Sequence, residues 1–364
     1  MRILHIMGGA NAGGIAAVVL NYMTHLDQNK FHFDIALTGH KPGMLGEKMM
    51  ALGATFYELP LKSQGLNAYE DALSDLLERE HFDAVHVHEN STSYVALRVA
   101  KKHGVPCRIA HAHTSGYYTT LHGFLTVFSG RILNYHYATK IVGCGKLAGD
   151  RIFGVRHMKM RKAQVLPNAI ETEHFKFNPE ARIRLRRELN LGDTYTIGLI
   201  GRFSPQKNQP FALRVIRQLH QQNPNFLFLL VGVGETMDEM SAYCHDNQMD
   251  GYVTFLGTRS DITDIYQALD VCIMPSLYEG FPVAGVEALA SGLPLLLSDQ
   301  ITSELNFSAR AKYLPLKESF WVEELLKKPQ NPRRENGYLE VRENGFDIRD
   351  TSSILERIYR ESEH

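Results

Sequence analysis

The first half of the chain alternates short, almost wholly apolar runs with longer stretches in which apolar residues recur every three or four positions. Continuous apolar runs of this length indicate strands buried on both faces, and the longer period indicates helices. Strands separated by helices of this size predict βαβ units and a parallel sheet. The expected strands are 2–7, 31–38, 55–59, 84–88, 107–111 and 140–144, and the expected helices are 15–26, 44–52, 69–80, 91–103 and 121–137.

The second half repeats this arrangement without repeating the sequence. Between the halves, Pro167 and Asn168 favour a turn, because proline restricts the residue before it and asparagine suits turns. A chain of 364 residues also exceeds one ordinary core. We therefore expect domains at 1–167 and 168–349. The expected elements of the second half are strands 196–200, 227–231, 253–255, 270–274 and 294–297, and helices 209–222, 235–247, 262–269, 283–291, 318–328 and 351–360.

Composition narrows the class of protein. The 39 basic and 40 acidic residues give a formal net charge of -1, so no global field favours a nucleic acid partner. Four single cysteines predict neither a disulfide framework nor a zinc site. The chain shows no signal-peptide pattern and no apolar run of membrane-spanning length, so we expect a cytoplasmic protein.

The most informative stretch is 274–292, which predicts a strand, a loop and a helix beginning near Pro282. Ligands of open α/β sheets bind at the carboxyl ends of strands, where free backbone N–H groups at a helix start suit phosphate or hydroxyl oxygens. Glu279 and Glu287 flank this loop, and two carboxylate acceptors suit a polyol. The plainer alternative is that Glu279 is a charge at a helix start and Glu287 a solvated residue of a helix face.

A second loop, 201–208, follows the first strand of the second half and carries Arg202 and Lys207. A guanidinium fork with an ammonium group stabilises the charge that grows on a departing diphosphate. The alternative is two solvated bases, but positive charge at a helix start is unfavourable and needs a reason.

The segment 275–292 resembles the E-x7-E signature of retaining glycosyltransferases of family 4, and 298–304 is similar to the branch that builds bacterial capsular and exopolysaccharides. The loop at 201–208 is similar to the diphosphate motif of that family. The resemblance implies the GT-B fold: two facing Rossmann-like α/β domains, with a cleft between an acceptor domain and a donor domain. It also implies that a last helix, about 350–364, packs back on the first domain.

The resemblance extends to individual residues. It places His113 beside the reacting sugar, the diphosphate at Arg202 and Lys207, the sugar hydroxyls at Glu279 and the ribose at Glu287. The catalytic set is therefore His113, Arg202, Lys207 and Glu279. The expected nucleotide-sugar contacts are Gly13, Gly14, Arg202, Lys207, Gly232, Thr258, Arg259, Gly280, Phe281, Pro282, Val283, Ala284 and Glu287.

The implied reaction moves a sugar from a nucleotide diphosphate sugar, most simply a UDP-sugar, to a glycan or lipid-linked acceptor with retention of configuration. The sequence shows no carboxylate placed as a covalent nucleophile and no D-x-D-like pattern, so we expect same-face attack without a cofactor or a divalent metal. Two alternatives are a sugar-nucleotide epimerase of the same fold and a sugar-nucleotide-binding protein without transfer activity.

Two features of the first domain leave their interpretation open. The pairs His86/His88 and His111/His113 each place both rings on one face of a strand, which suggests a metal site, but no carboxylate completes a known ligand set. The aromatic stretch 115–137 is explained most simply as a buried helix, yet it would also suit peripheral contact with the inner face of the cell membrane.

Overall fold

The computed structural model describes residues 1–10, 14–115, 120–160, 162–328 and 333–361, and every statement below concerns these residues. The chain forms two compact units, each considered by itself. The first unit is 1–169 together with 348–364, and the second is 170–347. The division after Ala169 falls two residues beyond Pro167, where the sequence predicts the boundary.

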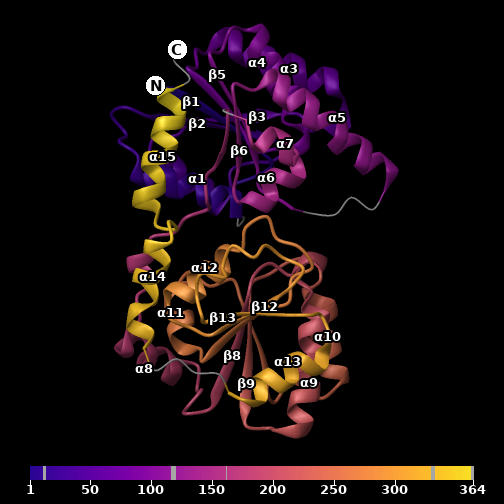
Figure 1. The fold of residues 1–364 in the computed structure, drawn as a ribbon, viewed down its shortest axis with the longest axis vertical. Helices are drawn as coiled ribbons and strands as arrows, with labels where there is room; N and C mark the ends of the chain where they lie inside the picture. The colour runs from indigo at the N-terminus through magenta and orange to yellow at the C-terminus, as the bar shows by residue number, and fades with distance from the viewer. Residues whose placement is uncertain (11–13, 116–119, 161, 329–332, 362–364) are drawn as a thin grey trace. The chain divides into compact units, whose positions relative to one another are not determined.

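The described part of the first domain forms a seven-stranded parallel sheet in the order β3-β2-β1-β4-β5-β6-β7 (Figure 1). One face is covered by α1, α2 and α15, and the other by α3, α4 and α6. The strands are β1 (Arg2–Met7), β2 (His32–Thr38), β3 (Phe56–Leu59), β4 (Ala84–Val87), β5 (Cys107–Ala112), β6 (Lys140–Gly143) and β7 (Ala163–Val165). The helices are α1 (Gly14–His25), α2 (Met44–Ala51), α3 (Leu66–Arg79), α4 (Tyr94–Lys102), α5 (Leu121–Tyr137), α6 (Lys146–Ile152), α7 (Val155–Met158) and α15 (Ile348–Arg360).

The described part of the second domain forms a six-stranded parallel sheet in the order β10-β9-β8-β11-β12-β13. In both sheets the order in which successive strands are added therefore reverses once, between β1 and β4 and between β8 and β11, as in dinucleotide-binding folds. The strands are β8 (Tyr195–Ile200), β9 (Phe226–Val231), β10 (Val253–Gly257), β11 (Val271–Met274), β12 (Leu295–Ser298) and β13 (Ala311–Leu314). The helices are α8 (Pro179–Glu188), α9 (Gln209–Gln222), α10 (Met237–Asp246), α11 (Ile262–Ala268), α12 (Val283–Ala290), α13 (Glu318–Leu326) and α14 (Gly337–Glu343).

The elements that the sequence pattern missed are short or polar. Helix α8 carries four arginines in ten residues, so its apolar period is weak, although Asn178 caps it by accepting hydrogen bonds from the N–H groups of Glu180 and Ala181. Strand β13 sits at the sheet edge and is only partly buried, which removes the continuous apolar run expected of a central strand. Helices α6, α7 and α14 have seven residues or fewer, too few to show a period.

Helix α5 begins and ends as predicted, but the simplest explanation of its apolar residues, burial, is wrong. Much of one face is exposed to solvent. The exposed side chains follow helical spacing and include two phenylalanines whose rings stack on each other. These residues, which we call the α5 stripe, are Leu121, Phe124, Leu125, Phe128 and Ile132.

Within the described residues, no helix is both long enough and apolar enough to cross a membrane.

Candidate functional site

The candidate site lies at the carboxyl ends of β8 and β11. These two parallel strands are neighbours at the point where the strand order of the second sheet reverses. The loop after β8 carries Arg202 and Lys207, and the loop after β11 carries Glu279. The two loops are joined directly, because the Leu277 N–H donates to Gln206 O at 2.9 Å. The strand order thus explains why residues more than seventy positions apart meet here.

Lys207 and Glu279 form the centre of the site. The Lys207 Nζ lies 2.6 Å from Glu279 Oε1, and both side chains are mostly buried, at 20% and 6% exposed. Gln206 Nε2 donates to the other oxygen, Oε2, at 3.0 Å and also to Tyr278 O. A pair so shielded from solvent is screened much less than a surface ion pair. The sequence predicted Lys207 and Glu279, but not Gln206.

Glu287 occupies the second turn of α12 beside this pair. The Tyr266 hydroxyl, from α11, donates to Glu287 Oε2 at 2.8 Å and also lies 3.1 Å from Ala284 O. Burial raises the pKa of Glu287 to about 7, while the hydrogen bond from Tyr266 and the charge of Lys207 act in the opposite direction. The side chain is therefore not the freely solvated residue of the plainer alternative.

Arg202 is placed differently from Lys207. Its guanidinium forms an ion pair with Glu235 at 2.7 Å, and both side chains are largely exposed. Its loop is held close to the next strand end, since a Cβ at Gly232 would lie 2.2 Å from Gly201 O, and Gly232 has a φ of +131°. The glycine at 232 is thus required for the approach of two strand-end loops.

The loop amides at 280–284 differ in part from expectation. The Val283 N–H donates to Phe281 O at 3.1 Å, so it is not a free donor, and Pro282 has no N–H to offer. The Phe281 ring packs on Phe346, 5.2 Å between centroids, which fixes the loop against the core. The backbone N–H groups of this loop that remain candidates for ligand contacts are those of Gly280, Phe281 and Ala284.

The remaining predicted contacts lie in two places, just beyond β10 and at the start of α1. Thr258 is exposed just beyond β10, and Arg259 is engaged by Asp261 at 2.6 Å and by Glu188 at 3.2 Å. Those carboxylates raise the pKa of Arg259, so it carries its charge in an existing ion-pair network. Gly14 begins α1, whereas Gly13 lies outside the described residues.

His113 lies just beyond the carboxyl end of β5 in the first domain. Its backbone N–H donates to Asn90 Oδ1 at 2.8 Å, and Asn90 adopts a left-handed conformation with a φ of +55°. Its ring is hydrogen-bonded to His88 at 2.8 Å. The four histidines predicted to share one sheet face do meet there, and His5 joins them. His5 could not be predicted from the sequence, because a single histidine in an apolar strand forms no pattern.

Two family models match this chain. The model described as Glycosyltransferase Family 4 matches residues 12–174, and the model described as Glycosyl transferases group 1 matches residues 194–314. The putative glycosyltransferase EpsF of Bacillus subtilis (strain 168) is 32% identical over 374 residues, which cover 98% of this chain and 96% of the relative. The chain belongs to glycosyltransferase family 4.

Two further matches to this family-4 glycosyltransferase have lower sequence identity than EpsF. The UDP-Gal:alpha-D-GlcNAc-diphosphoundecaprenol alpha-1,3-galactosyltransferase of Escherichia coli is 27% identical, over 82% of this chain and 79% of the relative. Among solved structures, Anabaena Alr3699/HepE in complex with UDP-glucose matches with a TM-score of 0.82 at 16% identity, covering 99% of this chain and 100% of the other. This likeness shows the fold class, which is GT-B.

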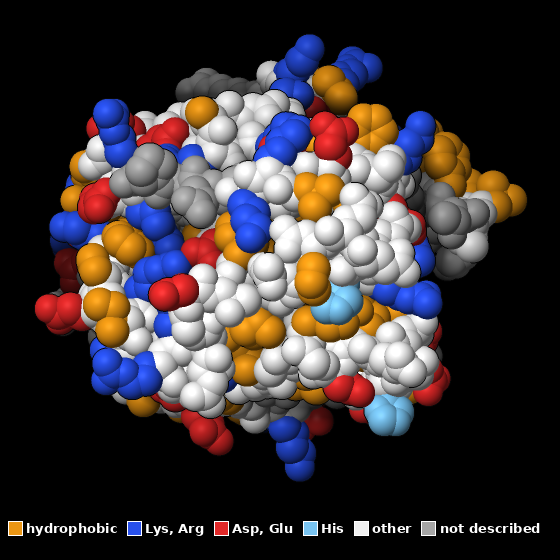
Figure 2. All heavy atoms as spheres, turned by 90° about the horizontal axis from the view of Figure 1, so that it is seen from below, with side chains coloured by type: hydrophobic (Ala, Val, Ile, Leu, Met, Phe, Trp, Pro, Cys, Tyr) orange, Lys and Arg blue, Asp and Glu red, His pale blue; other side chains and the backbone are white. Residues whose placement is uncertain are grey.

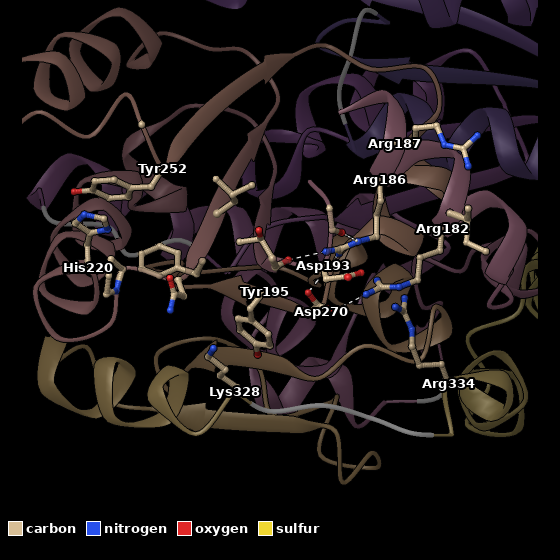
Figure 3. Close-up of a pocket in the computed structure, with 18 of the residues that line it drawn as sticks. Arg182, Arg186, Arg187, Asp193, Tyr195, His220, Tyr252, Asp270, Lys328 and Arg334 are labelled. Atoms are coloured by element: carbon tan, nitrogen blue, oxygen red, sulfur yellow. Dashed lines mark hydrogen bonds and ion pairs between the residues drawn. The ribbon is translucent and has the colours of Figure 1, made fainter. Parts of the chain in front are cut away.

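A hollow of the described second domain lies away from this site, at the amino ends of β8, β9 and β11. Its volume is about 1410 Å³ (Figure 3). Basic side chains line it, among them Arg182, Arg334 and Lys328. Figure 2, the view from below, shows Lys and Arg interspersed with Asp and Glu on that side of the glycosyltransferase. Two of its arginines, however, are already bonded: Arg186 donates to Ala268 O at 2.7 Å and Arg182 to Leu269 O at 2.8 Å.

Arg334 completes this set by donating to the carbonyls of Tyr266 at 2.9 Å and Leu269 at 3.0 Å. These carbonyls lie at the carboxyl-terminal end of α11, where helix carbonyls lack intrahelical partners and cations are favourable. In Figure 3 Arg182, Arg186 and Arg334 converge around Asp270, while Arg187 points away. We interpret the hollow as the outer side of a structural helix cap.

Proposed function

We propose that this glycosyltransferase transfers a sugar from a UDP-sugar to a glycan or lipid-linked acceptor in the synthesis of a bacterial exopolysaccharide or capsule, with retention of anomeric configuration. The observation that carries the proposal is the shielded Lys207–Glu279 pair beside Glu287 at the switch point of the second sheet. The names of EpsF and of the UDP-Gal-dependent relative, and the complex of HepE with UDP-glucose, support the choice of donor and pathway.

The charges at this site suit the two halves of a nucleotide sugar. Lys207 presents an ammonium with three donors, so it can keep Glu279 while it contacts a diphosphate oxygen. Arg202 needs only to exchange an exposed ion pair with Glu235, which costs little because such pairs are worth at most about 1 kcal/mol. Glu279 accepts hydrogen bonds from sugar hydroxyls, and Glu287 from those of the ribose.

Retention follows from the position of the carboxylates in this proposal. Glu279 already holds Lys207 and Gln206, which lowers its nucleophilicity and favours a binding role. The acceptor hydroxyl then attacks from the face that the diphosphate leaves, and passes its proton to the leaving phosphate oxygen. A product assay by NMR, reading the anomeric configuration of donor and product, tests this step.

No divalent metal is required in this proposal, because Lys207, Arg202 and the α12 start supply the positive potential at the diphosphate. The cationic side chains thus take the role that a metal ion can take in stabilising the charge of a phosphate leaving group.

An epimerase is less well supported, because it would need an acid/base carboxylate in the first domain. Glu89 lies after β4, but Lys62 Nζ is 2.5 Å from its Oε2 and Thr38 donates to its Oε1 at 3.1 Å. The Tyr69 hydroxyl also donates to Oε2, at 3.3 Å. A carboxylate engaged by three side chains is a structural ion pair.

The acceptor side of the proposal includes peripheral membrane contact through the α5 stripe, because exposed apolar residues on one helix face suit an interface with lipid. The test is co-sedimentation with phosphatidylglycerol vesicles. The double variant Phe124→Ser/Phe128→Ser should lose most binding, whereas Ile183→Ser, an equally exposed apolar residue on α8, should bind as the unmodified protein does. Equal binding by all three proteins contradicts membrane contact through α5.

Calorimetry tests the donor assignment. Glu287→Gln should weaken binding of UDP and UDP-sugar alike, because ribose is present in both. Glu279→Gln should leave UDP affinity nearly unchanged and reduce transfer, because in this proposal the sugar is the only part of the donor molecule that contacts the Glu279 carboxylate. Equal loss of UDP affinity in the two variants would show that these roles are misassigned. Thermal shifts with UDP-, GDP- and ADP-sugars identify the base, since the preferred donor stabilises the fold most.

A further inference from the structure

Five buried or half-buried histidines and one tyrosine form a continuous polar path inside the first domain. The histidines come from β1, β4, β5 and the residues just beyond β4 and β5, and the tyrosine comes from α15, nearly 250 residues further along the chain. All face the side of the sheet that α1 and α15 cover, which is otherwise apolar. We call this set the histidine chain; its members in bonding order are His113, His88, His5, Tyr359, His86 and His111.

Hydrogen bonds link each member to the next. His113 Nε2 lies 2.8 Å from His88 Nδ1, and His88 Nε2 lies 2.9 Å from His5 Nδ1. The Tyr359 hydroxyl lies 3.3 Å from His5 Nε2 and 2.9 Å from His86 Nδ1. The tyrosine therefore joins two strings of imidazoles that the sheet alone does not connect.

The path ends on β5. His86 Nε2 lies 3.0 Å from His111 Nδ1, and the other nitrogen of His111, Nε2, is buried with no hydrogen-bond partner among the described residues. At the opposite end, His113 Nδ1 is in the same condition. The rings of His111 and His113 lie side by side, with centroids 4.0 Å apart. The two terminal rings of the path, His111 and His113, are thus neighbours near the carboxyl end of β5.

The five imidazoles are neutral at ordinary pH. Burial lowers the pKa of His5 and of His113 to about 3, and it lowers the pKa values of the other three well below their usual value. A neutral imidazole has one N–H donor and one bare acceptor nitrogen. Since each inner ring is bonded through both nitrogens, the direction of one hydrogen bond fixes the direction of the next.

Only two uniform arrangements satisfy every bond. In one, all five rings carry the proton on Nε2, the tyrosine hydroxyl donates to His86, and His113 presents a bare Nδ1. In the other, all five carry it on Nδ1, the hydroxyl donates to His5, and His113 presents an N–H. Any mixed state leaves at least one buried donor or acceptor of the chain without a partner, for example the Tyr359 hydroxyl proton when His5 and His86 both donate to its oxygen.

We propose that the histidine chain is ordered as one unit, and that Tyr359 is a positioning residue that holds His113 in a single tautomer. The tautomer decides whether His113 Nδ1 accepts or donates a hydrogen bond when a hydroxyl group is bound beside it. The ordering stands by itself, whereas its consequence for catalysis rests on the proposed function and on the place beside the reacting sugar that the family resemblance implies for His113.

A metal ion is the competing explanation, since two trios within this set bring their nitrogens within 4.8 Å. The separations along the chain, 2.8–3.0 Å between imidazole nitrogens, equal those of N–H···N hydrogen bonds and fall short of the roughly 3.3 Å between two ligands of a tetrahedral ion. An ion would also use the nitrogens that bond neighbouring rings. The geometry therefore favours the proton-ordered chain.

The experiment is long-range ¹H–¹⁵N NMR of the full chain labelled with ¹⁵N-histidine, which reports the protonated nitrogen of each ring. We expect the five chain histidines to share one tautomer and not to titrate between about pH 5.5 and 8.5. In Tyr359→Phe, which keeps the ring and removes the link, His113 should show both tautomers. Turnover should then fall about twofold to tenfold with KM unchanged, as the competent fraction of His113 falls.

The matched control is Tyr22→Phe, which removes a hydroxyl from a buried tyrosine of the same core that bonds Pro167 O instead of a histidine. It should leave the His113 tautomer and turnover unchanged. Mixed tautomers in the unmodified protein, an unaltered His113 in Tyr359→Phe, or one equivalent of bound metal would each overturn the proposal. If Tyr359→Phe does not fold, the spectrum of the unmodified protein decides. A lack of transfer activity would contradict the proposed function while leaving the NMR result to decide the ordering.

Discussion

The two edges of the second sheet both collect charged side chains, but they use them in opposite ways. At the amino edge, Arg182, Arg186 and Arg334 are bonded to carbonyls at the end of α11. At the carboxyl edge, Lys207 is bonded to one carboxylate side chain, Glu279, which a ligand can share. The amino edge, with its cluster of arginines and its hollow of about 1410 Å³, is therefore the structural one. Charge density therefore does not identify the candidate site, whereas position at the carboxyl ends of the strands does.

The largest expected effect comes from the carboxyl edge. Lys207→Ala should lower turnover by about 10²–10³, because an electrostatic contact with developing charge is lost, and Arg202→Ala should also lower it. Steady-state kinetics with the preferred UDP-sugar measure both. Lys328→Ala, a lysine on the hollow of the other edge, is the matched control and should turn over normally. Normal turnover in both site variants would remove the diphosphate assignment.

The next effect belongs to the amino edge and should appear in stability. Arg334→Met keeps the aliphatic stem but removes the donor to the carbonyl of Tyr266 and one of the two arginine donors to the carbonyl of Leu269, and it should destabilise the second domain by about 2–4 kcal/mol. Arg187→Met, on the same hollow but exposed, should change stability by less than about 0.5 kcal/mol. Denaturant unfolding compares them. UDP affinity of folded Arg334→Met should be unchanged, and a large loss would make the hollow a ligand site.

How much of the fold and of the candidate site could be predicted from the sequence depends on how far apart in the chain the interacting residues lie. The Glu279–Glu287 spacing and the Arg202–Lys207 loop are local patterns, so both were predicted. The Tyr266–Glu287 bond and the Arg334 cap join elements that only the folded sheet brings together. Burial of α5 was inferred from composition, which cannot tell a core face from an exposed one. The histidine pairs were visible on their strands, but Tyr359 was not, because a contact from the far end of the chain leaves no local pattern.

Glu287 makes the stability of the folded protein depend on pH. Its folded pKa, about 7, is above its usual 4.5, so the folded protein binds this proton more tightly than the unfolded chain does. The group therefore reduces stability progressively as the pH rises from about 4.5 to 7, by up to about 3 kcal/mol above that window. Glu287→Gln should be more stable than the unmodified protein at pH 8 and similar to it at pH 4.5. Thermal melts across this range decide, and parallel curves would contradict the raised pKa.

The smallest expected effect is that of removing divalent cations. With Lys207, Arg202 and the start of α12 supplying positive potential, turnover with a UDP-sugar should change by less than about twofold in excess EDTA. A metal-dependent mechanism predicts nearly complete loss and recovery on adding Mg²⁺ or Mn²⁺. Repeating the chelation on Lys207→Ala sharpens the test, because a cation that rescues only this variant would occupy the place of the lost ammonium. Rescue of the unmodified enzyme would instead show that the carboxyl edge needs a cation that its own side chains do not replace.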